Sequence, residues 1–265
     1  MSNQLSFQQV GSGQPLVILH GFTGSAEAML PLAKCLSEER TIYLIDLPGH
    51  GQTGLLDDLS LHGFEETVRL LKDLLTHLDL EEVDLLGYSM GGRLALGFAV
   101  TYPETVNKLI LVSSSPGLSD PNERRSRQRS DNDLADQIIE DGVENFVDSW
   151  MQQPLFASQQ RLDPAILEEQ RQQRLTNDAE GLAASLRGAG TGVQPSLWQS
   201  LDLVVADALL VVGEEDSKFR RIAMKMSAKF KESSISVIPD AGHAVHLENL
   251  PALNDAICSF LVEHQ

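Results

Sequence analysis

Ser89 stands at the centre of Gly87-Tyr-Ser-Met-Gly91, with a glycine two residues before it and two residues after it. An apolar run, residues 83–86, leads into this pentapeptide, and a good helix-forming stretch, residues 92–100, follows it. The pattern predicts a strand, a sharp turn and a helix, because side chains at the two glycines would collide with the strand or the helix. Such a turn exposes the serine hydroxyl at a helix N-terminus, where developing negative charge is favoured. Although G-x-S-x-G also arises by chance, this context makes Ser89 a candidate catalytic residue.

A serine hydroxyl needs an imidazole to remove its proton, and the imidazole needs a carboxylate to fix its tautomer. Asp216 and His243 each follow a strand-like run, and the order Ser, Asp, His is the one expected for an α/β-hydrolase. We therefore predict Ser89, Asp216 and His243 as catalytic residues. Glu214 and Glu215 are alternatives to Asp216. Three other histidines fit structural roles better, namely His20, His50 and His246.

Two backbone N–H groups aimed at one point are needed to stabilise an oxyanion. The residue after the serine, Met90, is expected to supply one, and Phe22 in the small-residue loop 21–25 is expected to supply the other. Simple packing of the Phe22 ring is the alternative, and both can hold because the donor is in the backbone.

The elements that would position these groups alternate between strand and helix. Parallel strands with helices on both faces are predicted, and functional groups then come from loops beyond the carboxyl ends of the strands. The fold class is therefore α/β, an α/β-hydrolase fold with a mostly parallel twisted sheet. Strands are expected at 5–10, 16–20, 41–46, 83–86, 108–113, 207–213 and 234–238, and helices at 26–38, 62–78, 92–100, 220–231 and 251–263.

The alternation stops between about residues 114 and 203, where the chain is polar, arginine-rich and helical in pattern. We expect a core formed by residues 1–114 and 204–265, with residues 115–203 inserted as a helical cap. Eight of the thirteen arginines and none of the seven lysines lie between Pro116 and Gln199. Guanidinium groups bind carboxylates in a planar, two-pronged way. The alternative is a solvated surface with ordinary ion pairs, to which Arg124 and Arg161 are assigned.

Composition limits the remaining possibilities. The chain has 265 residues, 42% of them hydrophobic, which suits one domain with a sizeable core. Its net charge of −18 argues against nucleic acid or an anionic membrane as a partner. The start has no basic region and no apolar run is long enough to span a membrane, so a cytoplasmic protein is expected. Cys35 and Cys258 are expected to be buried free thiols, and no metal or cofactor is expected.

These signatures resemble the α/β-hydrolase superfamily over the whole chain. A narrower set is similar to the 2-succinyl-6-hydroxy-2,4-cyclohexadiene-1-carboxylate synthases of menaquinone biosynthesis. That resemblance covers core and cap, and it rests on His20-Gly-Phe-Thr-Gly-Ser25, Gly87-Tyr-Ser-Met-Gly-Gly-Arg93, Ser115-Pro-Gly-Leu118, Arg127-Gln-Arg-Ser-Asp131, Trp150 with Gln153-Pro154, Ala157-Ser158 and Asp216-Ser-Lys-Phe219.

The resemblance implies a lyase that eliminates pyruvate from a substrate with three carboxylates, with Ser89 as a base and without an acyl-enzyme. It implies a substrate-binding set of Tyr88, Arg93, Arg127, Arg129, Trp150 and Arg174, in which Arg127 and Arg129 are hard to separate. The expected partner is thus a small polycarboxylate. A serine hydrolase of esters or of carbon–carbon bonds is the first alternative, because it uses the same triad. A ligand-binding protein without catalytic activity is the second.

Overall fold

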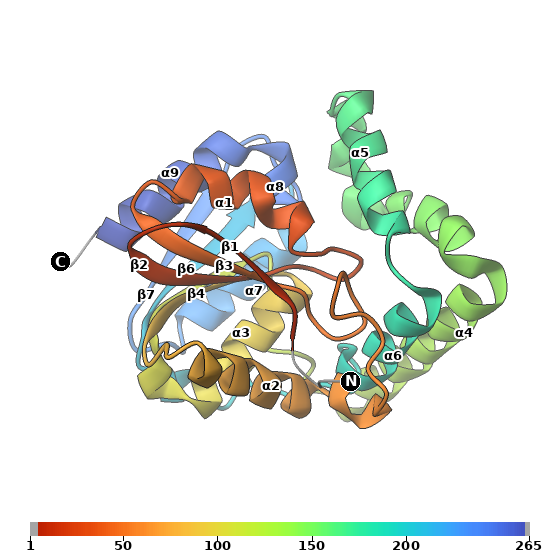
Figure 1. The fold of residues 1–265 in the computed structure, drawn as a ribbon, viewed down its shortest axis with the longest axis horizontal. Coiled ribbons are helices and arrows are strands. Elements are labelled where there is room, and N and C mark those ends of the chain that lie inside the picture. The colour runs from red at the N-terminus through yellow and green to blue at the C-terminus, as the bar shows by residue number, and fades with distance from the viewer. Residues whose placement is uncertain (1–4, 263–265) are drawn as a thin grey trace.

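The computed structural model describes residues 5–262, and its centre is a seven-stranded sheet in the order β1-β3-β2-β4-β5-β6-β7 (Figure 1). β1 runs antiparallel to β3, and every other neighbouring pair is parallel. The strands are β1 (Phe7–Gly11), β2 (Gln14–Leu19), β3 (Arg40–Ile45), β4 (Val83–Tyr88), β5 (Val106–Val112), β6 (Asp207–Gly213) and β7 (Ser233–Ile238). This arrangement confirms the predicted fold class.

Helices cover both faces of the sheet, which explains why β2, β4 and β6 are nearly continuous apolar runs. One face packs on α1, α8 and α9, and the other on α2, α3 and α7. The helices are α1 (Leu30–Leu36), α2 (Phe64–His77), α3 (Met90–Thr101), α7 (Ser217–Ser227), α8 (Val245–Glu248) and α9 (Leu250–Val262), with short 3-10 helices η1 (Glu27–Met29), η2 (Leu59–His62), η3 (Pro103–Thr105) and η5 (Leu201–Leu203).

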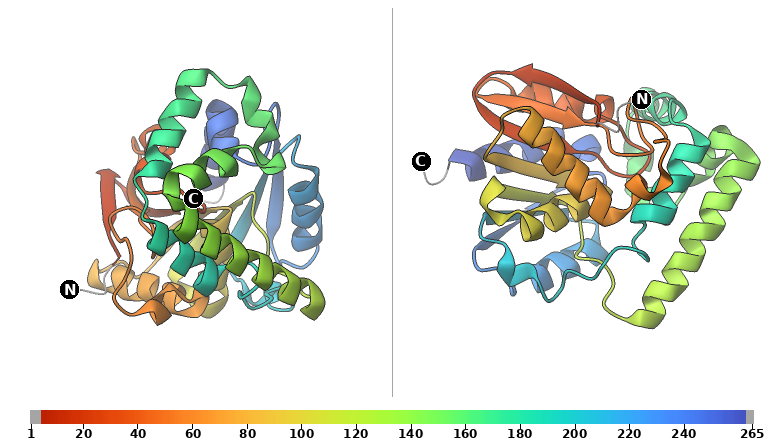
Figure 2. Two further views of the ribbon diagram at one scale, coloured as in Figure 1. Left: turned by 90° about the vertical axis from the view of Figure 1, so that its right-hand side faces the viewer. Right: turned by 60° about the horizontal axis from the view of Figure 1, so that its bottom comes forward.

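A second group of helices lies between β5 and β6 in the chain and beyond the carboxyl ends of the strands in space (Figures 1 and 2). It has a small apolar core of its own, to which α4 contributes Ile138 and α6 contributes Leu182. The positive φ of Gly142 interrupts α4. We call this group the cap; it consists of α4 (Pro121–Met151), η4 (Pro154–Arg161), α5 (Pro164–Leu175) and α6 (Ala179–Ala189). The domain boundaries at 114/115 and 203/204 stay predictions.

Two of the expected helices differ from the observed ones by division or by more than two residues at an end. The helix expected at 26–38 is divided into η1 and α1, and Pro31 lies in the first turn of α1, where a proline is tolerated. The helix expected to start at residue 220 starts at Ser217, because the Asp216 side chain caps it by accepting a hydrogen bond from the Phe219 N–H. The thiols are free, but Cys35 is exposed and Cys258 is only partly buried, so the expected burial of both was wrong. Within residues 5–262, no helix has the length and apolarity needed to cross a membrane.

Candidate active site

Ser89 lies between β4 and α3 with φ 50° and ψ −106°, a conformation that non-glycine residues rarely adopt. Its N–H donates to the Val112 carbonyl oxygen at 2.9 Å, which ties the turn to the neighbouring strand. A Cβ added at Gly87 would lie 2.4 Å from the Gly91 carbonyl oxygen, and one added at Gly91 would lie 2.3 Å from the Leu19 carbonyl oxygen. Both positions therefore require glycine, because neighbouring backbone atoms lie too close for a side chain.

The structure brings Ser89, Asp216 and His243 together. His243 Nδ1 lies 2.9 Å from Asp216 Oδ2, and His243 Nε2 lies 3.1 Å from Ser89 Oγ. The ionised carboxylate can only accept, so Nδ1 carries the hydrogen and Nε2 is left to accept the hydroxyl proton. Glu214 and Glu215 are exposed and do not contact the imidazole. The arrangement can remove a proton from the serine hydroxyl.

The backbone around His243 is held by Glu248, which the sequence reasoning missed. Its fully buried carboxylate accepts the N–H of Gly242 at 2.8 Å and the N–H of Ala244 at 3.1 Å. Arg161 of the cap lies 3.6 Å from the same carboxylate and donates to the Asp240 carbonyl oxygen. Its position five residues after the predicted histidine could have indicated this role in the sequence.

Phe22 and Met90, the expected oxyanion donors, line one cavity together with Ser89 and His243. Met90 is the first residue of α3, and N–H groups of a first helical turn have no partner within the helix. The Phe22 ring packs edge-on against Trp150, with centroids 5.4 Å apart. Ring packing and a backbone donor role are thus compatible at Phe22.

The cavity has a volume of about 210 Å³ and lies between core and cap. Its apolar wall includes Leu134, Phe156 and Leu186. Two buried polar atoms of its lining have no hydrogen-bond partner among the residues described, namely Trp150 Nε1 and Ser113 Oγ. The lining of the cavity therefore combines apolar side chains with polar groups that have no partner among the described residues.

Arg93 and Arg127 place two guanidinium groups at this cavity. Arg93 is buried and donates to two neutral acceptors, the Ala189 carbonyl oxygen at 2.9 Å and Gln194 Oε1 at 2.6 Å. Burial, followed by the charge of Arg127, lowers the pKa of Arg93 to about 10, so it stays charged at neutral pH. Arg127 also donates to Asp131 at 2.7 Å. An anion bound near both arginines would relieve their repulsion.

Arg174, which the resemblance places in the substrate-binding set, does not line this cavity. It lines an adjoining pocket of about 30 Å³, separated from the larger cavity by the shared residues Phe22, Tyr88 and Phe156. Its guanidinium lies over the Phe156 ring, 5.5 Å from the centroid, and burial lowers its pKa. Tyr88 is also buried, and burial raises its pKa.

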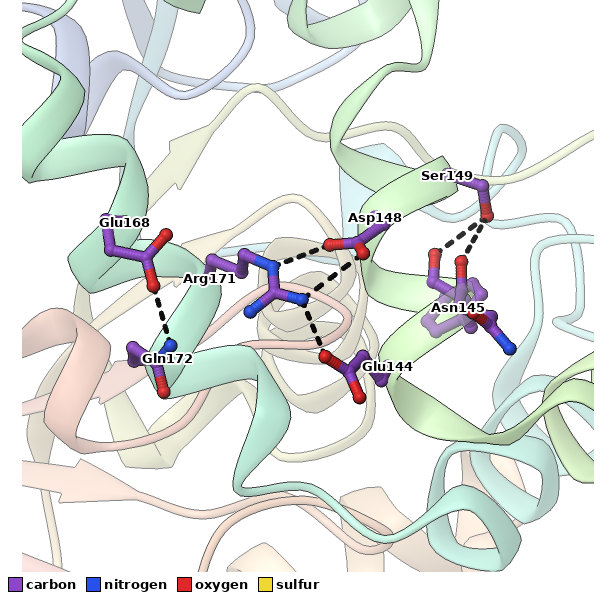
Figure 3. Close-up of polar contacts among 8 residues, drawn as sticks. Glu144, Asn145, Asp148, Ser149, Glu168, Arg171 and Gln172 are labelled. Carbon is purple, nitrogen blue, oxygen red and sulfur yellow. Dashed lines mark hydrogen bonds and ion pairs between the residues drawn. The ribbon is translucent and has the colours of Figure 1, made fainter.

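Arg129 is exposed and is not part of the cavity lining, so the structure does not bring it together with the other predicted site residues. Two residues along a helix correspond to a rotation of about 200°, which puts Arg129 on the other side of α4 from Arg127. Arg124 and Arg161 are not purely solvated either, since each donates to a backbone carbonyl of another segment. Arg171 does form ordinary ion pairs, which join α5 to Asp148 and Glu144 of α4 (Figure 3).

Lys218 is a cavity-lining residue that the sequence reasoning did not single out as a site residue. It is exposed, and its ammonium group lies 5.2 Å from the centroid of the Phe219 ring. Its position two residues after Asp216 could have indicated it. Within the described part of the chain, no group of three or more His, Cys, Asp or Glu side chains is arranged to hold a metal ion.

Comparison with known proteins places this geometry in a family. Residues 14–250 match the sequence model of the α/β-hydrolase fold. A putative 2-succinyl-6-hydroxy-2,4-cyclohexadiene-1-carboxylate synthase of Bacillus subtilis (strain 168) is 44% identical over 94% of this chain and 91% of its own length. The solved structure of MenH from S. aureus has a TM-score of 0.92 and 33% identity, with 97% of each chain covered. A malate-bound esterase from Thermogutta terrifontis has a TM-score of 0.86 and 27% identity, with 97% of this chain and 92% of the esterase covered. The chain therefore belongs to the α/β-hydrolase fold family and, within it, to the 2-succinyl-6-hydroxy-2,4-cyclohexadiene-1-carboxylate synthases.

Proposed function

We propose that this protein is a lyase of menaquinone biosynthesis. It eliminates pyruvate from 2-succinyl-5-enolpyruvyl-6-hydroxy-3-cyclohexene-1-carboxylate and forms 2-succinyl-6-hydroxy-2,4-cyclohexadiene-1-carboxylate. One observation carries the proposal beyond the family relationship. A single cavity contains the hydrogen-bonded Ser89 and His243 together with the guanidinium groups of Arg93 and Arg127. A site of this composition suits a substrate that carries several carboxylates and must lose a proton.

In this reaction Ser89 acts as a base. His243 Nε2 takes the hydroxyl proton while Asp216 stabilises the imidazolium, and Ser89 Oγ takes the ring proton next to the succinyl ketone. The electron pair of the broken C–H bond first forms the enolate of the succinyl ketone. When the enolate collapses, this pair forms a ring double bond, and the existing ring double bond moves one position. The C–O bond to the enolpyruvyl group then breaks. Enolpyruvate takes up one proton and becomes pyruvate, so no water and no acyl-enzyme are needed.

Negative charge develops on the succinyl ketone oxygen during proton removal. The backbone N–H groups of Phe22 and Met90, at the wall that also contains Ser89, are our proposed donors to this oxygen. The start of α3 adds the positive end of a helix dipole at the same point. The enolate is therefore stabilised where it forms.

Substrate recognition is assigned to the positive and polar groups around the cavity. Arg93 is the strongest candidate for a carboxylate, because burial deprives it of solvent and its hydrogen-bond acceptors are neutral. Arg127 and the unpartnered Trp150 indole N–H approach the cavity from the cap. Tyr88 forms part of the wall, and Arg174 contributes its charge from behind that wall.

Pyruvate release tests the proposal. Purified protein is given the enolpyruvyl substrate, and pyruvate is measured with lactate dehydrogenase and NADH. We expect rapid release by the wild type and a loss of at least about a thousandfold in Ser89→Ala. If the wild type consumes no substrate, or if Ser89→Ala is fully active, the proposed reaction is wrong.

A serine hydrolase is the second candidate, and the similarity to the Thermogutta terrifontis esterase favours it. The same Ser89 would then attack an ester and form an acyl-enzyme that water resolves. Mass spectrometry after rapid quenching separates the two reactions. An acyl group on Ser89 during turnover of the enolpyruvyl substrate would support the hydrolase mechanism, and unmodified protein would support the lyase.

Cytoplasmic location, independence from cofactors and metals, and the lack of nucleic-acid or membrane partners remain predictions. Cell fractionation tests the location. Activity after dialysis against a chelator tests the independence from metal ions.

A further inference from the structure

Thr23 directly follows the proposed oxyanion donor Phe22 and has an unusual backbone conformation. Its φ is 67°, in the left-handed region that β-branched side chains disfavour. A residue keeps such a conformation when its surroundings hold it there. The contacts of Thr23 are therefore relevant to the position of the Phe22 N–H.

Three groups from other segments hold Thr23. Its N–H donates to His50 Nε2 at 3.2 Å, its carbonyl oxygen accepts from Asn177 Nδ2 at 2.9 Å, and its hydroxyl accepts from Arg174 at 3.3 Å. Both peptide groups of Thr23 are thus fixed, one by a core residue and one by a cap residue. His50 can accept only while it is neutral, and burial keeps its pKa well below the usual value.

Asn177 joins three segments through one side-chain amide. It is buried just after α5, and its Nδ2 donates to Thr23 and to the Arg174 carbonyl oxygen, while its Oδ1 accepts from Gly51 N–H at 3.2 Å. The helix before it is fixed to α4 by the ion pairs of Arg171 (Figure 3). The position of the cap is therefore linked through Asn177 to the loop that carries Phe22.

We propose that Asn177 is a positioning residue. Its amide holds the Thr23 carbonyl, and through it the Phe22 N–H, in the orientation that stabilises the enolate. Asn177 does not line the catalytic cavity, so it acts through the loop and not on the substrate. The inference rests on the proposed function for its effect on the reaction, but the link between Asn177 and the loop is independent of the substrate.

Kinetics of Asn177→Asp provide the first test. The introduced carboxylate can still accept from Gly51 but has no hydrogen to donate to Thr23. We expect kcat for pyruvate release to fall about tenfold to a hundredfold with KM within about twofold, because misplacement of an oxyanion donor affects the transition state most. At lower pH the kcat of Asn177→Asp should come closer to that of the wild type at the same pH, because a protonated carboxyl group can donate to Thr23 again.

Asn145→Asp is the matched control in the cap. Asn145 Nδ2 donates to Asp141 of the same helix, and the change should leave kcat unaltered. A higher KM with unchanged kcat in Asn177→Asp would overturn the inference, since it would make Asn177 a substrate-binding residue. A kcat deficit that does not narrow at lower pH would contradict the proposed hydrogen bond.

Hydrogen exchange provides a readout that does not depend on the reaction. In Asn177→Ala, backbone amides of residues 21–25 should exchange faster than in the wild type, whereas residues 143–151 of α4 should be unchanged. Unaltered exchange of residues 21–25 in Asn177→Ala would overturn the inference, even if the wild type releases pyruvate as proposed. If the wild type releases no pyruvate, the proposed function fails, and the exchange result still decides whether Asn177 holds the loop.

Discussion

The two walls of the cavity are built in different ways. The core wall depends on backbone geometry, with Ser89 held in a rare conformation and the His243 loop held by the buried Glu248 carboxylate. The cap wall depends on side chains that extend from helices, such as Arg127 and Trp150 of α4. We propose that the core wall performs the chemistry and that the cap wall, together with the buried Arg93 of α3, selects the substrate.

The largest expected effect comes from the core wall. His243→Ala should lower kcat by at least about a thousandfold with little change in fold, because the serine then lacks its base. Asp216→Asn is the sharper variant, since the amide oxygen can still accept from the Phe219 N–H and cap α7. Circular dichroism and pyruvate release measure fold and activity, and wild-type activity in His243→Ala would contradict the assignment.

Arginine substitutions should have smaller effects that depend on the substrate. A charge-assisted hydrogen bond contributes about 1.5–3 kcal/mol, so Arg93→Met and Arg127→Ala should each lower kcat/KM for the enolpyruvyl substrate by about tenfold to a hundredfold. Turnover of a neutral p-nitrophenyl ester should be spared, because it has no carboxylate to bind. Arg129→Ala is the control on the same helix. If Arg129→Ala lowers kcat/KM for the enolpyruvyl substrate as much as Arg127→Ala does, substrate recognition is not confined to one side of α4.

Stability of the core is expected to depend on its buried histidines. Burial lowers the pKa of four histidines, and for His246 it does so to about 3. These side chains take up protons less readily in the folded protein than in the unfolded chain, which does so below about pH 6.5. The free energy of unfolding should therefore fall as pH decreases from 6.5, by at most about 1.4 kcal/mol per pH unit for each histidine.

Urea unfolding between pH 7.5 and 5.0 measures this dependence. His246→Phe should make the free energy of unfolding depend less steeply on pH, because one neutral buried imidazole is gone. Replacement of the exposed His77 by Gln serves as the control. An unchanged slope in His246→Phe would show that its imidazole does not contribute to the pH dependence.

The core wall was largely predictable from sequence. Ser89, Asp216 and His243 each follow an apolar run, and parallel strands bring the residues after their carboxyl ends to one edge of the sheet. The side of α4 that faces the cavity was not predictable, since it depends on how the helix is rotated against the core. This is why Arg127 and Arg129 could not be separated. The position of Arg174 on α5 depends in the same way on how the cap packs against the core. Asn177 acts through contacts between distant segments, which no local pattern reveals, whereas Glu248 accepts from backbone N–H groups only four and six residues away.

The ratio of two specificity constants distinguishes a lyase with an anionic substrate from a hydrolase of neutral esters. We propose measuring kcat/KM of the wild type for the enolpyruvyl tricarboxylate and for neutral p-nitrophenyl butyrate, and repeating both measurements with Arg93→Met. The account predicts a preference of at least about a hundredfold for the tricarboxylate, since two carboxylate contacts of about 1.5 kcal/mol each suffice for that ratio, and it predicts that Arg93→Met reduces the preference. Equal or better turnover of the ester, unaffected by the loss of Arg93, would contradict it and favour a hydrolase of neutral esters.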